Sequence, residues 1–103
     1  MTTNGPYAEM SAAGTSQATA AEMTADKVLV TTVSTSAEGI VLPARNLNDE
    51  IVVVNGQGTH NLKVYPRSGG KLNNASADAA VEVPPYRAVR FVGINNLNWM
   101  AFY

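Results

Sequence analysis

The residue best suited to acid–base or nucleophilic chemistry in this sequence is its only histidine, His60. It lies between Thr59 and Asn61, in a stretch that predicts the loop of a hairpin. No serine occurs in a strained elbow of the Gly-x-Ser-x-Gly type, where a serine–histidine nucleophile is expected. We therefore predict that His60 is a turn residue and that the chain is not an enzyme.

Metal and cofactor sites are not indicated by the remaining polar residues. One histidine and no cysteine cannot supply the usual zinc ligand sets. Asp49 and Glu50 are adjacent, so on a strand their side chains face opposite sides and cannot act as an acid–base pair. The stretch 67–72 resembles a phosphate-binding loop only in part, because Leu72 occupies the position of the magnesium-binding serine or threonine. No cofactor and no metal are expected.

Composition and charge exclude further classes of function. Charged residues make up only 15% of the chain, against about 25% in an average protein. The formal net charge is −1, so no strong field attracts nucleic acid or an acidic membrane. No run approaches the roughly 20 apolar residues of a membrane helix, and the first residues lack the features of a secretory signal. A surface poor in charge is usually covered by other protein, so we expect a soluble, protein-binding domain.

The first 26 residues differ in composition from the rest. They contain seven alanines, five threonines and three acids but no lysine or arginine. Such a segment has little apolar surface to bury and cannot offset the entropy of ordering itself. We predict a flexible N-terminal arm over residues 1–26, which becomes ordered against a partner, and a β domain over residues 27–103. A short helix over 17–25 and a dispensable tail are the open alternatives.

Short β-rich runs alternate with turn residues from Lys27 onward. The expected strands are Lys27–Val33, Ile40–Leu42, Ile51–Val54, Leu62–Tyr65, Val81–Val83, Ala88–Ile94 and Trp99–Tyr103. Residues 51–65 and 88–103 each predict a hairpin. About seven strands at this spacing predict an all-β fold, a small antiparallel sandwich, jelly roll or barrel.

Two of these strands are apolar on both faces. Ile51–Val54 and Trp99–Tyr103 lack the apolar–polar alternation of a strand with one face in water. A body this small has few residues to form a second interior, so we expect the second face to be buried in a symmetric oligomer, a trimer. The open alternative is that both strands are central in a sandwich covered by loops. The expected interface residues are Ile51, Val53, Trp99 and Phe102.

The body resembles a type of small structural protein that recurs in tailed bacteriophages. The resembling stretches are Gly14–Ala20, Val30–Val33, Gly39–Ala44, Ile51–Asn55, Leu62–Pro66, Phe91–Val92 and Trp99. The likeness runs loosely from about Gly14 to the C-terminus, and its motifs specify an architecture rather than a role. Such modules occur as free-standing capsid decoration (cement) proteins and within fibre proteins, and the family carries no catalytic residues.

The resemblance implies a virion structural protein that is made in a bacterial cytoplasm and then lies on the capsid surface, where it braces neighbouring subunits. Its partners are then the major capsid protein and further copies of itself in a homotrimer. A chain made only of arm and module favours this function over two alternatives, a trimeric fibre or receptor-binding module and a carbohydrate-binding module. The expected anchors of the arm on the capsid are Pro6, Tyr7, Met10 and Met23.

Overall fold

The computed structural model describes residues 8–23, 25, 27–42, 50–73, 75–94 and 98–102. These residues form nine strands in two sheets and no helix, hence none that could cross a membrane. The all-β prediction is confirmed. Each of the seven strands expected from residue 27 onward is found, with bounds that agree to within one residue wherever they are described. Two further strands lie before residue 27.

The larger sheet has five strands in the order β1-β3-β5-β8-β9. They are β1 (Ala8–Ser11), β3 (Lys27–Thr32), β5 (Glu50–Asn55), β8 (Ala88–Gly93) and β9 (Trp99–Phe102). The first three run parallel to one another, and β8 and β9 extend the sheet in antiparallel pairing.

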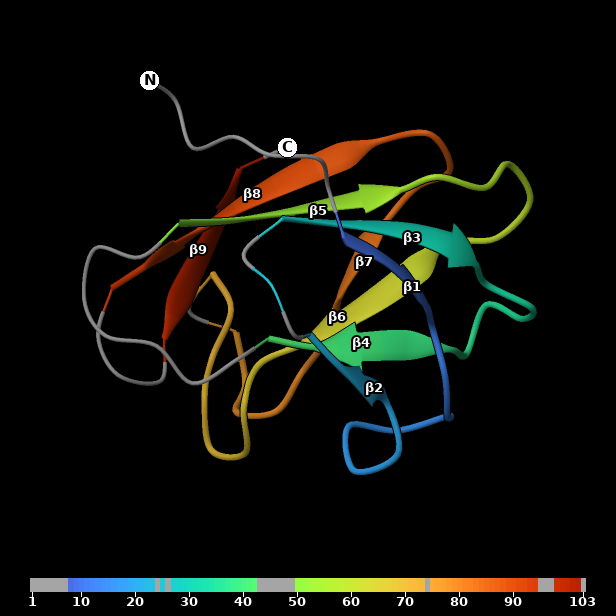
Figure 1. Ribbon diagram of the computed structural model, residues 1–103. Helices are drawn as coiled ribbons and strands as arrows, with labels where there is room; N and C mark the ends of the chain where they lie inside the picture. The colour runs from blue at the N-terminus through green and yellow to red at the C-terminus, as the bar shows by residue number, and fades with distance from the viewer. Residues whose placement is uncertain are drawn as a thin grey trace, which may run out of the picture.

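The smaller sheet has four strands in the order β2-β4-β6-β7. They are β2 (Ala21–Glu22), β4 (Gly39–Val41), β6 (Leu62–Tyr65) and β7 (Val81–Val83). Here β2, β4 and β6 are parallel, and β7 pairs with β6 in antiparallel register. Figure 1 shows the two sheets as layers, with β3, β5 and β8 above β4 and β6.

The first six strands alternate between the two sheets, so the chain winds through three coils that each add one strand to each sheet. Each of the first four strands therefore lies beside the strand two positions later in the sequence. Val28 pairs with Val53 in the larger sheet, and Ile40 pairs with Val64 in the smaller one.

This winding corrects the predicted topology. Both sheets are mixed rather than antiparallel, and they are open rather than closed into a barrel. The predicted hairpin over residues 51–65 is wrong, because β5 and β6 lie in different sheets. The hairpin predicted at the C-terminal end is confirmed by the antiparallel pairing of β8 with β9.

The core lies between the sheets and is filled by alternate residues of the strands. Ile51, Val53 and Trp99, which were expected in an oligomer interface, are buried here, and Trp99 is only 2% exposed. That part of the interface prediction is wrong, because two layers of strands give these side chains an interior within one chain. The largest fully buried side chains are Trp99, Phe91, Ile40, Leu42, Ile51, Leu62, Leu72, Val28, Val30, Val53, Val64 and Val83.

Residues 8–23 belong to the body and do not form a separate arm. β1 runs parallel to β3, β2 runs parallel to β4, and Ala12 and Met23 are buried in the shared core. The neighbouring strands supply the hydrogen bonds and apolar surface that an alanine-rich segment lacks by itself. Residues 16–20 make one hydrogen-bonded turn, closed by Ala20 N–H donating to the Ser16 carbonyl at 2.9 Å, and not a helix.

The expected capsid anchors are placed accordingly. Met23 is 6% exposed, so its side chain is not free to contact a partner, and Met10 is half-buried with its side chain packed against the core. Pro6 and Tyr7 lie outside the described residues.

Candidate functional site

The His60 side chain makes a hydrogen bond that holds a loop in place. Its Nδ1 lies 3.0 Å from the Val33 carbonyl oxygen, which can only accept, so Nδ1 carries the proton and donates it. The bond fastens the loop between β5 and β6 to the end of β3. Across the described ranges, no group of three or more histidine, aspartate or glutamate side chains is arranged to hold a metal ion.

Asn55 organises the same end of the molecule. Its side chain is fully buried, and its Nδ2 donates to the carbonyls of His60 and Val83, both at 2.9 Å. Its backbone N–H donates to Arg87 O, and its carbonyl accepts from Tyr86 N–H, both at 2.9 Å. The β5–β6 loop and the β7–β8 turn are therefore held rigidly against each other.

The β7–β8 turn, residues 84–87, will be called the Tyr86 tip. Arg87 N–H donates to the Pro84 carbonyl at 3.2 Å and closes the turn. Tyr86, the third residue, has φ of 59°, a conformation that turns normally give to glycine or asparagine and that costs another residue about 1–2 kcal/mol. Its ring lies beside Gly58, where an added Cβ would come within 2.7 Å of the tyrosine hydroxyl oxygen. The Tyr86 side chain remains exposed.

The outer face of the five-stranded sheet carries apolar side chains from four of its strands. Alternation along each strand turns these side chains away from the core. Met100 and Phe102 are 38% and 48% exposed, large values for apolar side chains. The apolar side chains of the outer face are Leu29, Val52, Val54, Ala88, Val92, Met100 and Phe102.

The central charges of this outer face are paired with groups on the same face. Arg90 lies opposite Phe102 in the register, and its guanidinium carbon is 5.5 Å from the centre of the Phe102 ring. Its Nε is 3.4 Å from a carboxylate oxygen of Glu50. An exposed pair of this kind adds little stability. Because the two charges neutralise each other, however, the face can be covered without burying an unpaired charge there.

The edge of this sheet at β9 is closed by the chain itself. Trp99 N–H donates to the Lys71 carbonyl at 3.0 Å, and Asn73 N–H donates to the Trp99 carbonyl at 2.9 Å. The Asn73 side-chain oxygen accepts from Ala101 N–H at 2.7 Å. Strand addition by a partner is thereby blocked at this edge, and a partner can contact β9 only through its outer face.

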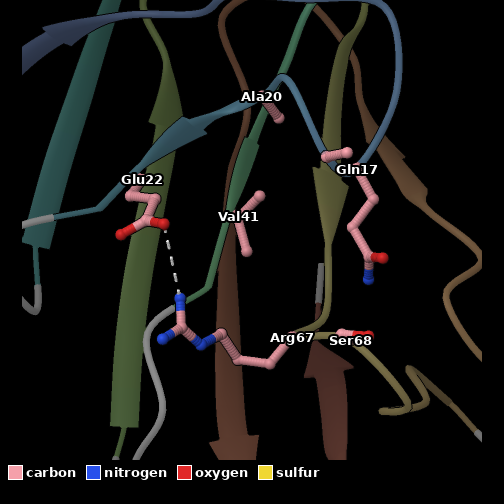
Figure 2. A pocket seen from close by; sticks show the side chains of 7 residues that line it. Gln17, Ala20, Glu22, Val41, Arg67 and Ser68 are labelled. Carbon is pink, nitrogen blue, oxygen red and sulfur yellow. Dashed lines mark ion pairs between the residues drawn. The ribbon is translucent and has the colours of Figure 1, made fainter.

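A hollow of about 500 Å³ lies over the other sheet, between the turn after β1 and the chain that follows β6 (Figure 2). Across it, Arg67 Nη1 is 3.8 Å from a Glu22 carboxylate oxygen. The Gln17 amide donates to Pro66 O at 2.7 Å and to the Asp78 carboxylate at 3.0 Å. These polar groups bond to one another between segments of the chain, so the hollow is a place where the fold is held together. It is lined by Gln17, Ala18, Ala20, Glu22, Val41, Arg67 and Ser68.

Comparison of the chain with protein-family models, curated proteins and solved structures finds no match.

Of the four residues expected in an interface, only Phe102 lies on an exposed face. The outer-face residues Val52 and Met100 were missed, although each directly follows or precedes an expected one. The signal was the continuous apolar run in both strands. It shows that both faces are apolar, but it does not say which set of alternating residues points outward.

Proposed function

We propose that the protein is a non-catalytic structural protein of a phage virion, a capsid decoration protein. In this proposal it lies on the head surface as a homotrimer and braces neighbouring subunits of the major capsid protein. The apolar outer face of the five-stranded sheet is the observation that carries the proposal. The resemblance described for the sequence supplies the kind of particle.

The outer face has the properties of a surface that other protein covers. Four adjacent strands, β3, β5, β8 and β9, contribute apolar side chains to it, and its Arg90–Glu50 charges are already paired. Covering apolar surface is favourable by about 25 cal/mol per Å². In a closed trimer identical faces are buried together and none stays exposed. We place the trimer contact at Val52, Val92, Met100 and Phe102.

Bracing requires a body that resists deformation. Here both sheets share one core, and in the three coils the chain crosses repeatedly from one sheet to the other. The loops at the Asn55 end are tied by buried hydrogen bonds. Such a body transmits force between the subunits that it touches, and several modest contacts per trimer add up through multivalency.

Of the two alternative functions, the carbohydrate-binding module receives less support from the geometry. A carbohydrate-binding module stacks sugars on a platform of exposed aromatic rings, but Trp99 and Tyr65 are buried. The two exposed rings of the described residues, Tyr86 and Phe102, lie on different elements, the β7–β8 turn and β9. A fibre or receptor-binding module would use the same outer face for trimer formation, and it differs from our proposal in binding host cells instead of capsids.

The test combines light scattering with sedimentation. We expect wild-type protein to have the mass of a trimer and to co-sediment with undecorated capsid shells of the phage that encodes it. Met100→Asp and Phe102→Asp should each give folded monomers that bind capsids weakly, because avidity is lost. Ser76→Asp, an exposed loop change at a residue that is not part of the outer face, is the matched control.

A monomeric wild-type protein would exclude the trimer. Wild-type protein that ignored capsids but bound host cells would replace decoration with the fibre function.

A further inference from the structure

Three described residues other than glycine have positive φ, and two of them have a structural reason. They are Asn73, Asp78 and Tyr86. Asn73 accepts a hydrogen bond from Ala101 N–H, and Asp78 accepts from Gly69 N–H and from Gln17. Asparagine and aspartate also adopt this conformation more readily than other residues do. Tyrosine does not, so Tyr86 needs another explanation.

The Tyr86 side chain makes few contacts that could offset the strain. Tyr86 is 76% exposed, and its hydroxyl has no hydrogen-bond partner among the described residues. Gly58 leaves the space in which the ring lies. A bulky aromatic side chain is thus held in solvent, in a turn position suited to glycine, by backbone bonds to Asn55. A strained backbone conformation that no contact of the side chain offsets points to a functional role.

Arg87, the next residue, adds a second exposed side chain that makes no contact the fold depends on. It is exposed, and within the part of the chain that the structure describes its guanidinium makes no ion pair. The nearby polar side chains, in contrast, are already occupied. Gln57 accepts from both the backbone and the hydroxyl of Thr59, and it donates to the Asn55 side chain. The tip therefore offers one ring, one hydroxyl and one cation on a rigid support.

We propose that the Tyr86 tip inserts into a pocket on the capsid protein, one with apolar walls for the ring and a carboxylate for Arg87. This inference rests on the proposed function and names the contact by which the trimer attaches. Tyrosine and arginine are the residue types that most often dominate protein interfaces. A sugar site is less well supported, because it needs several free polar groups converging in a concave site, and those near Tyr86 are bonded to one another.

The geometry of the trimer would strengthen such a contact. The tip is at the start of β8, and the trimer contact is placed on the outer face of the sheet, so the two surfaces are separate sets of residues. Three tips per trimer then bind together, and a modest affinity of each becomes a firm attachment.

The experiment uses full-length Tyr86→Gly, which removes the ring and relieves the strain at once. We expect its melting temperature to equal that of the wild type or to exceed it by up to about 5 °C. Its trimer should persist, and its affinity for undecorated capsid shells should fall by about 30-fold or more, as for an interface hot spot. Arg87→Gln should weaken binding with the fold unchanged, Tyr86→Phe should keep most of it, and Ser76→Asp should change neither.

Other outcomes would overturn the inference. A Tyr86→Gly protein that melts several degrees lower would make the tyrosine structural. A Tyr86→Gly protein that binds capsids as tightly as the wild type would remove the tip from the contact, while leaving the proposed function intact. Wild-type protein that does not bind capsids would remove both. NMR shifts at Tyr86 caused by polygalacturonate, with no effect of the substitution on capsid binding, would assign the tip to an acidic glycan.

Discussion

The side chains of β5 show how position on a strand separates chemically identical residues. Val53 is fully buried between the sheets, whereas Val52 is half-buried on the outer face. The first contributes to the stability of one chain, and the second contributes, in our proposal, to contact between chains. Phe91 and Phe102 are divided in the same way between β8 and β9.

Two aspartate substitutions separate these roles. We expect Val53→Asp to prevent folding, because an unpaired charge buried in the core costs several kcal/mol. We expect Phe102→Asp to remain folded, because its side chain is 48% exposed. Circular dichroism with denaturant titration measures both. A stably folded Val53→Asp protein would contradict the placement of Val53 in the core.

The sequence predicts the exposed and buried residues only in part, and Asn55 shows why. It directly follows four apolar residues and precedes Gly56, a pattern that is typical of a turn. In the structure it is the last residue of β5 and is completely buried. Its partners, the carbonyls of His60 and Val83, come from other segments. Burial of an amide depends on such distant partners, which a local pattern does not show.

The strands themselves follow from local pattern, but their pairing does not. The runs of valine, isoleucine and leucine gave the positions of β3 to β9 well. The six-residue connection 56–61 fits a hairpin loop as well as a crossing between sheets, so β5 and β6 were paired wrongly. The parallel order is set by the three coils of the whole chain. No short stretch carries that information.

Gly39 is a point at which the coils come close together. A Cβ at this residue would lie 2.5 Å from the Lys63 carbonyl oxygen and 3.0 Å from the Tyr65 ring. We expect Gly39→Ala to separate β4 from β6 and to lower the free energy of unfolding by about 1–3 kcal/mol. The denaturation midpoint measures the change.

Gly56→Ala is the matched control for this substitution. Its Cβ would first meet the flexible end of the Leu29 side chain, at 2.6 Å, which can move aside. An equal loss of stability in both variants would contradict a specific close approach at Gly39.

Acid should weaken the pairing of β6 with β7. A hydrogen bond from Asn61 and the nearby Lys63 ammonium hold the pKa of Glu82 below its ordinary value of 4.5. Since the folded-state pKa is the lower one, this stabilisation is complete above the unfolded pKa and is lost as pH falls through the folded pKa. The effect is small, because the Glu82 side chain is 49% exposed.

Denaturation midpoints from neutral pH down to about pH 2 would show the effect. Glu82→Gln should remove this contribution, so that the denaturation midpoint falls less steeply as the pH is lowered. An identical fall of the midpoint in both proteins would show that the pair does not stabilise the fold.

At the scale of the whole molecule, the N-terminal residues complete the stack of strands. β1 and β2 form the first coil, and they pair with the edges of β3 and β4 in the two sheets. Composition alone assigned this segment to a flexible arm, because Ala8–Ser11 has weak strand propensity and few apolar side chains. Pairing with β3 overrides that propensity. A strand of this kind is visible only once its neighbour is in place.

Deleting residues 1–23 therefore tests the unity of the fold. The deletion removes the first coil with Ala12 and Met23, and it exposes the core together with the edges of β3 and β4. We expect the shortened chain to unfold or aggregate, as seen by circular dichroism and light scattering. Met23→Ala in the full chain should lower the free energy of unfolding by about 2–5 kcal/mol, the usual effect of such a core truncation. Glu9→Gln, an exposed change on β1, should leave stability unaltered. If the shortened chain instead folded as stably as the full one, residues 8–23 would be an arm on an independent domain of residues 27–103.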